Sequence, residues 1–207
     1  MVKVHGPCFS IDASGTLADT LTFTKWKGRN VVRERVIPSN PRSGPQTGMR
    51  SMMKFLSQIW DGLTTVNKAT WEDLADATVI SEFNAFTSFN MLRWRSYKTP
   101  SKETPAAEVS TPAAAPTTTP TGGIRQIQLS IADGTPAPDW GWIIHRSIET
   151  AFTPAYSNVI AVIPWGTTPT IYIDTPLDPD TYYYRLMGFN DDGIVGTLEA
   201  EITADAT

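Results

Sequence analysis

The feature that most constrains the fold of this chain is a stretch rich in proline and threonine between residues 99 and 123. It reads TPSKETPAAEVSTPAAAPTTTPTGG and contains five prolines. Such residues offer little apolar surface, so burial cannot offset the conformational entropy that is lost when they become ordered. The stretch therefore predicts a semi-extended spacer, at roughly 3.1 Å per residue, that joins a module at residues 1–98 to a module at residues 124–207.

The charge of the chain divides at the same stretch. Residues 1–100 carry 13 Lys and Arg against 8 Asp and Glu, a net charge of +5. Residues 101–120 carry 1 against 2, a net charge of −1, and residues 121–207 carry 3 against 11, a net charge of −8. The overall charge of −4 therefore hides a basic front and an acidic back. This division indicates two modules with different neighbours.

Several functional classes are excluded by what the sequence lacks. Cys8, His5 and His145 are its only cysteine and histidines, which speaks against a disulfide framework, a cysteine-based zinc site or a histidine-rich metal centre. No GxSxG, HExxH, P-loop or GxGxxG motif is present. The chain has no apolar run of about 18 residues, and its first residues lack the apolar core of a secretion signal. We therefore expect no enzyme, no cofactor, no metal site and no membrane segment.

The amino-terminal module is predicted to be α+β. Residues 21–24 alternate, residues 25–30 supply a turn with Gly28 and Asn30, and residues 31–36 continue extended, which is typical of a β-hairpin arm. Apolar residues at three- and four-residue spacing then predict about three short helices. The first carries Met49, Met52, Met53, Leu56, Ile59, Trp60 and Leu63; the second begins at Thr64 or Thr65; the third begins at Ser81. A three-helix pack of about 55 residues is small for independent stability, so burial against another chain stays open.

The carboxy-terminal module is predicted to be all-β. Its short apolar segments are residues 124–131, 140–146, 159–163, 170–173, 182–187 and 197–202. Turn signals such as Asp133-Gly134 and Trp165-Gly166 separate them. Asp191-Asp192-Gly193 predicts a turn rather than a calcium loop, because the spaced carboxylates of an EF-hand are missing. About seven short strands at regular spacing indicate a β-sandwich.

One segment of this module carries a family resemblance. Residues 177–190, LDPDTYYYRLMGFN, resemble the E–F corner and F strand of fibronectin type III domains. The resemblance implies a seven-stranded sandwich with a tyrosine corner, in which a phenol hydrogen-bonds back to the corner backbone. Strand alternation turns Tyr182 and Tyr184 inward, and it makes Tyr182 the expected corner tyrosine, with Tyr183 as the alternative. Leu177 and Leu186 are the expected core residues beside them.

The front half carries a second resemblance. Its residues are Ser14-Gly15-Thr16-Leu17, FTKWKGRN at 23–30, VIPSNP at 36–41, Arg50-Ser51, Leu63-Thr64, Thr70-Trp71 and Phe83-Asn84-Ala85-Phe86. Together these segments resemble a pattern found in structural proteins of tailed-bacteriophage and prophage particles, over roughly residues 10–97. The resemblance implies assembly into a virion. It further implies an anchor at residues 1–98 and a displayed sandwich at residues 124–207.

The arm gathers basic side chains around one tryptophan. These candidate docking residues are Lys25, Trp26, Lys27, Arg29, Arg33, Arg35 and Arg42. Such a set could bind a phosphate backbone with aromatic stacking, dock onto an acidic protein surface, or form a passive solvated face. Glu34 interrupts the basic run and the net charge is modest, so we favour protein docking over nucleic acid. Arg33 and Arg35, on one side of an extended segment, are the best candidates for ion pairs with a neighbouring subunit.

These observations lead to a hypothesis of a non-enzymatic phage virion structural protein. We expect a capsid decoration, cement or head-fibre-like protein, made in the host cytoplasm and located on the capsid exterior. Its expected partners are other virion proteins, with the major capsid protein first, and a homo-oligomer or a weak host-surface or glycan contact stays open. The alternatives are a tail or head-to-tail connector component, an extracellular adhesion or carbohydrate-binding module, and a nucleic-acid-binding packaging protein.

Overall fold

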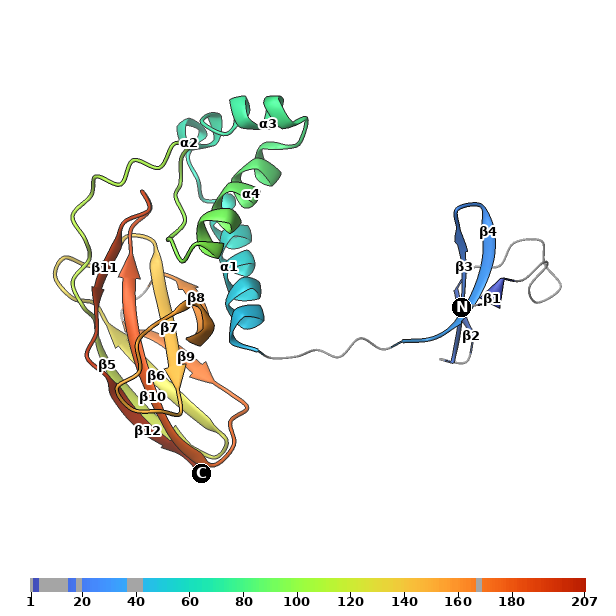
Figure 1. Cartoon of the computed structure of the whole chain (residues 1–207). Helices are drawn as coiled ribbons and strands as arrows, with labels where there is room; N and C mark the ends of the chain where they lie inside the picture. The colour runs from blue at the N-terminus through green and yellow to red at the C-terminus, as the bar shows by residue number, and fades with distance from the viewer. Residues whose placement is uncertain (1, 4–14, 18–19, 37–42, 167–168) are drawn as a thin grey trace. The chain divides into compact units, whose positions relative to one another are not determined.

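The computed structural model describes residues 2–3, 15–17, 20–36, 43–166 and 169–207 (Figure 1). The chain divides into two compact units, Met1–Pro41 and Arg42–Thr207. We call the first the hairpin unit and the second the body. Lys and Arg exceed Asp and Glu by three in the hairpin unit and fall short by seven in the body. No helix in the described part of the chain is both long and apolar enough to cross a membrane.

The hairpin unit is a small antiparallel sheet. Its strands are β1 (Val2–Lys3), β2 (Gly15–Leu17), β3 (Leu21–Trp26) and β4 (Arg29–Glu34), in the order β1-β4-β3-β2. Lys27 and Gly28 join β3 to β4, with φ of 47° and 75°. Two consecutive residues with positive φ suit the tight turn whose twist matches that of the flanking strands. Gly28 adopts this conformation without strain because it has no Cβ.

Four helices begin the body. They are α1 (Gly44–Trp60), α2 (Thr65–Ala69), α3 (Glu72–Thr78) and α4 (Glu82–Arg95). Pro45 lies in the first turn of α1, where the missing N–H leaves no broken hydrogen bond. Thr64 and Ser81 are the N-cap residues of α2 and α4, because each hydroxyl accepts a hydrogen bond from the backbone N–H three residues later. About three helices were expected, and the additional one arises because the chain turns at Thr70 and Trp71.

Two antiparallel sheets follow the helices. One contains β5 (Thr117–Gly123), β6 (Gln126–Ala132) and β9 (Thr170–Asp174); the other contains β7 (Gly141–Ser147), β8 (Val159–Pro164), β10 (Asp180–Phe189), β11 (Val195–Leu198) and β12 (Ile202–Ala206). Their orders are β5-β6-β9 and β11-β10-β7-β8. β12 and β11 pair with successive parts of β10, so they share one strand position. The two sheets therefore form a sandwich with seven strand positions, as the fibronectin type III resemblance implies.

The tyrosine corner lies at the start of β10. The Tyr182 hydroxyl donates to the Asp178 carbonyl oxygen at 3.1 Å, which identifies Tyr182 rather than Tyr183 as the corner tyrosine. Tyr184, Leu177 and Leu186 are buried in the same core cluster. The Tyr184 hydroxyl donates to Asp174 Oδ2 at 2.9 Å. Burial and the Asp174 carboxylate raise the pKa of Tyr184, so it remains a hydrogen-bond donor.

The predicted spacer at residues 99–123 is wrong. Residues 117–123 form β5, and Thr99, Ser101 and Ala113 before it are buried. Polar contacts hold the stretch in place: the Thr118 N–H and hydroxyl donate to the buried Glu199 carboxylate at 2.6 and 2.7 Å. The argument from missing apolar surface fails here because hydrogen bonds to distant side chains order a segment that has little surface to bury.

The helices and the sandwich share one hydrophobic core. Phe55 of α1 packs edge-on against Trp140 and Phe189 of the sandwich, at centroid distances of 5.4 and 5.2 Å. Ser51 of α1 also covers the edge of β8: it accepts from the Val162 N–H at 2.6 Å and donates to the Val162 carbonyl oxygen at 3.2 Å. The domain boundaries predicted at residues 98/99 and 123/124 are therefore wrong. The helices belong to the body because α1 packs against its sheet, α4 packs on α1, and α3 packs on α4 (Figure 1).

Candidate docking surfaces

The hairpin unit carries a basic face. Residues that pair across antiparallel strands point to the same side, and Trp26 pairs with Arg29 while Thr22 pairs with Arg33. The alternation continues to Arg35, whose backbone N–H donates to the Thr20 carbonyl oxygen at 2.7 Å. We call Trp26, Arg29, Arg33 and Arg35 the basic face. All four side chains are exposed.

The remaining predicted docking residues lie elsewhere. Lys25 alternates to the opposite side of β3, where it pairs with Asn30. Lys27 lies in the turn, with its Nζ 4.9 Å from the centroid of the Trp26 ring, at the distance of a cation–π contact. Arg42 lies outside the described residues. The predicted set is therefore divided between one face, the opposite face and the hairpin turn.

Few of the described residues of the hairpin unit are buried. Val31 is the one buried hydrophobic residue among those described there. Phe23 and Val32, which pair on the side opposite the basic face, are only half-buried, and Leu21 beside them is 39% exposed. Short sheets of this kind need a covering layer for independent stability. Among the described side chains, the side with Phe23 and Val32 is apolar and partly exposed, and the basic face carries exposed cations beside the buried Val31.

A second candidate surface lies on the helical side of the body. It is a groove of about 510 Å³ between the end of α1, α3 and the start of α4. Its lining is Trp60, Glu72, Ala75, Asp76, Ile80, Ser81, Glu82 and Phe83. We call it the acidic groove. The sequence pattern placed Trp60 on an apolar helix face, and the acids at the starts of α3 and α4 gave no separate signal.

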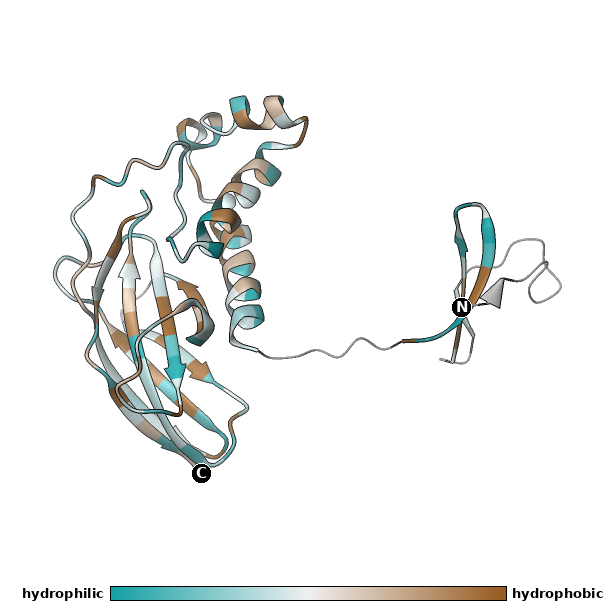
Figure 2. Cartoon of the chain, in the orientation of Figure 1, coloured by the Kyte–Doolittle hydropathy of each residue, from teal (hydrophilic) through white to brown (hydrophobic). Residues whose placement is uncertain are grey.

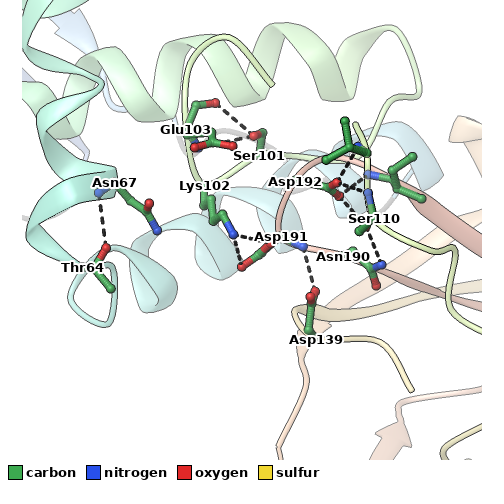
Figure 3. A network of polar contacts seen from close by, with 12 residues as sticks. Thr64, Asn67, Ser101, Lys102, Glu103, Ser110, Asp139, Asn190, Asp191 and Asp192 are labelled. Carbon is green, nitrogen blue, oxygen red and sulfur yellow. Dashed lines mark hydrogen bonds and ion pairs between the residues drawn. The ribbon is translucent and has the colours of Figure 1, made fainter. Parts of the chain in front are cut away.

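A further polar cluster of the body has a structural role (Figure 3). Lys102 Nζ contacts both carboxylate oxygens of Asp191 at 2.8 and 2.9 Å, and the Asp191 N–H donates to Asp139 Oδ1 at 2.8 Å. Burial raises the pKa of Asp139. Asp192 accepts from the Ser110 hydroxyl and from the Val109 and Ser110 backbone N–H groups, at 2.7–2.9 Å.

These contacts determine the role of the turn at residues 191–193. Burial alone would raise the pKa of Asp192, but its hydrogen bonds outweigh that effect and hold the pKa below its ordinary value. The turn thus ties residues 102–110 to the end of β10.

Nowhere in the described ranges do three or more His, Cys, Asp or Glu side chains form a group that could hold a metal ion.

His145 is buried where the helices meet the sandwich. Its Nδ1 lies 3.1 Å from the Arg185 carbonyl oxygen, so this nitrogen carries the proton and donates. Its Nε2 therefore accepts from the Tyr97 hydroxyl, 2.6 Å away. Burial lowers the pKa of His145 to about 4 and raises the pKa of Tyr97 to about 12. The neutral imidazole thus joins the segment after α4 to β7.

Comparisons with known proteins find similarity to solved structures over about half of this chain. No protein-family model and no curated protein matches the chain. Among solved structures, it is similar to a fibronectin type III domain of human fibronectin type III domain containing protein 3, with 14% identity over 48% of this chain and 91% of that one, and a TM-score of 0.34. An Fn3-like protein from Clostridium thermocellum is 20% identical over 47% of this chain and 96% of that one, with a TM-score of 0.36.

A β-1,2-glucanase from Parabacteroides distasonis is also similar, with 15% identity and a TM-score of 0.38. The match covers 47% of this chain and spans only 14% of the glucanase. The assignment of a fibronectin type III-like domain rests on the strand order and the tyrosine corner of the body itself.

Proposed function

We propose that this chain is a non-enzymatic structural protein of a tailed-bacteriophage particle, of the capsid decoration, cement or head-fibre kind. In this proposal the hairpin unit attaches the chain to an acidic surface of another virion protein, the major capsid protein first among them. The body is displayed on the capsid exterior. The sequence pattern of residues 10–97 supports assembly into a phage particle. The charge and burial of the two units support their separate roles in attachment and display.

One observation supports the attachment role: few of the described side chains of the hairpin unit are buried. Val31 is buried, whereas the four side chains of the basic face are all exposed. A sheet with so small a core gains stability when a partner covers one of its faces. Arginine suits such a contact because its planar guanidinium binds a carboxylate through two parallel hydrogen bonds.

The body has the opposite chemistry. It carries seven more acidic than basic residues and has two hydrophobic core clusters of its own. It can therefore fold without a partner, and its negative charge would keep closely spaced copies apart. An acidic surface facing solvent supports display rather than burial in the particle wall.

The test uses particles of the phage that encodes the chain. We expect the full chain in purified particles by mass spectrometry, and cryo-EM density for it on the capsid. The double variant Arg33→Glu/Arg35→Glu should lower its copy number in the particle at least about tenfold, since it places like charges against an acidic surface. Arg95→Glu, which reverses a charge in the body, is the matched control. Arg93 is unsuitable because its side chain forms an ion pair with Glu108.

Four results would contradict the proposal or replace part of it. Absence of the chain from particles would overturn it. Cryo-EM density for the chain on the tail or at the connector would instead identify it as a component of that part of the particle. Salt-dependent DNA binding that is lost with Arg33→Glu/Arg35→Glu would instead support a packaging role. Glycan binding by a chain that is absent from particles would favour an adhesion module.

A further inference from the structure

The acidic groove has an apolar floor that is only partly covered. Trp60 and Phe83 pack edge to face there, with ring centroids 5.7 Å apart, and both are half-buried. Lys68 of α2 places its Nζ 5.2 Å from the centroid of the Trp60 ring. The aromatic floor therefore already attracts one cation of the chain itself, at the distance of a cation–π contact.

The rim of the groove is uniformly acidic. Glu72, Asp76 and Glu82 line it, and within the described part of the chain none of the three carboxylates forms an ion pair. Glu72 and Glu82 lie in the first turns of α3 and α4, where a negative charge also favours the helix. Asp76, near the end of α3, gains nothing from that effect, so the helix dipole does not explain the whole rim.

The turn between α3 and α4, which is hydrophobic in Figure 2, adds a strained and exposed edge. Val79 is 91% exposed and Ile80 is 41% exposed. Val79 also has a φ of 55°, a left-handed conformation that is unfavourable for a β-branched residue. Exposed apolar side chains on a strained turn, next to an apolar groove, are typical of an interaction surface.

The turn of the hairpin unit has the complementary chemistry. Trp26 is 59% exposed at the end of β3, with Lys27 over its ring and Arg29 paired with it across the strands. Tryptophan is one of the residue types most enriched among the residues that dominate binding at protein interfaces, and here cations surround the Trp26 side chain. The groove offers an aromatic floor of sufficient volume for an indole and a ring of carboxylates for the cations.

We propose that copies of this chain associate head to tail, with the Trp26 turn of one copy seated in the acidic groove of the next. Trp26 occupies the apolar floor, and Lys27 and Arg29 face the carboxylates of Glu72 and Asp76. The net charges of the two units have the signs that this contact requires. Because the two surfaces are different, the contact is heterologous, and it can close by reciprocal exchange of hairpin units in a dimer or continue into rings or open chains.

This contact goes beyond the proposed attachment to a particle, and its test changes residues other than Arg33 and Arg35, the pair changed in the attachment test. Arg33 and Arg35 lie about four to six residues along the strand from Arg29, so about 13–20 Å separates them from the turn. Self-association of the purified chain requires no phage component. A chain that associates in solution but is absent from particles would support this inference and overturn the proposed function.

The test is the oligomeric state of the full chain by sedimentation velocity and light scattering. We expect the average mass to rise with concentration above that of the monomer. It should fall as the ionic strength rises, because the screening length shrinks from about 30 Å at 0.01 M to about 8 Å at 0.15 M. Trp26→Ala should weaken association about 30-fold, the effect of losing a central aromatic anchor. A chain that stays monomeric at low salt would overturn the proposal, and so would full association of Trp26→Ala.

Charge reversal makes the test specific for the two surfaces. Lys27→Glu/Arg29→Glu and Glu72→Lys/Asp76→Lys should each abolish association at low salt. A mixture of the two variants should associate again, because each then offers the other a complementary pair of surfaces. Asp73→Lys is the matched control: Asp73 shares the first turn of α3 with Glu72 but does not line the groove. Equal loss with Asp73→Lys, or no recovery in the mixture, would contradict the assigned contact.

Discussion

The hairpin unit and the body are both built on antiparallel sheets, but they differ in what covers those sheets. In the body, one sheet faces another, α1 lies over β8, and two hydrophobic clusters result. In the hairpin unit, a single sheet leaves most of its described side chains half-buried or exposed. The comparison shows that layering, rather than strand pairing, produces the independent core. It also separates two kinds of residue, those that maintain the body and those available to a partner.

The largest expected effect is on the layer that joins α1 to the sandwich. Phe55→Ala removes a fully buried ring that contacts both Trp140 and Phe189. We expect a loss of about 3–5 kcal/mol in the free energy of unfolding, measured by urea denaturation followed by circular dichroism and tryptophan fluorescence. Leu92→Ala, on the exposed side of α4, is the control and should change little. If the helices and sheets of the wild-type chain unfolded at clearly different urea concentrations, the shared core would be contradicted.

The next effect is the pH dependence that His145 contributes. Its folded-state pKa of about 4 lies below its ordinary value of 6.5, so the unfolded chain takes up a proton first as the pH falls. This contribution to stability is complete above pH 6.5 and decreases by about 3 kcal/mol between pH 6.5 and pH 4. Urea denaturation across this range should show a steeper decline for the wild-type chain than for His145→Gln. Parallel profiles would show that the imidazole is not buried in its neutral form.

The sandwich core and α1 show how far sequence reasoning reaches. Strand alternation placed Tyr182 and Tyr184 inside the sandwich, because a period of two depends only on neighbouring residues. The three- and four-residue spacing around Met52 and Leu56 likewise predicted a helix with one apolar face. Neither pattern could reveal that the face of α1 packs on β8, more than 100 residues away in the chain. That partner is determined by tertiary packing and not by local spacing.

The misplaced boundary has a similar cause. Composition described residues 99–123 correctly as poor in apolar surface, but their order depends on partners such as Asp192 and Glu199, which follow some 80 residues later. The acidic groove was missed for the same reason, since Trp60, Asp76 and Phe83 come together only when α1, α3 and α4 pack. The basic arm could be recognised because its residues are adjacent in the sequence.

The third prediction concerns the segment once expected to be a spacer. Glu199→Ala removes the carboxylate that accepts from the Thr118 N–H and hydroxyl, and it leaves the buried N–H without this partner. We expect a loss of about 1–3 kcal/mol in the free energy of unfolding and faster amide exchange in β5. Glu199→Gln is the matched control, because its amide oxygen can still accept from the N–H. A wild-type exchange pattern in Glu199→Ala would show that β5 does not depend on this contact.

The smallest effect on stability is expected in the hairpin unit, and it is the sharpest test of the comparison. Trp26→Ala and Arg33→Ala change exposed side chains, so each should alter the unfolding free energy of the body by less than about 0.5 kcal/mol. Urea denaturation checks this, with Phe55→Ala as the contrasting variant. The same two substitutions should weaken contacts with a partner, Trp26→Ala in self-association and Arg33→Ala in attachment. If either lowered the stability of the body as much as Glu199→Ala does, the two units would share structural support, and their division into a docking unit and a self-sufficient body would fail.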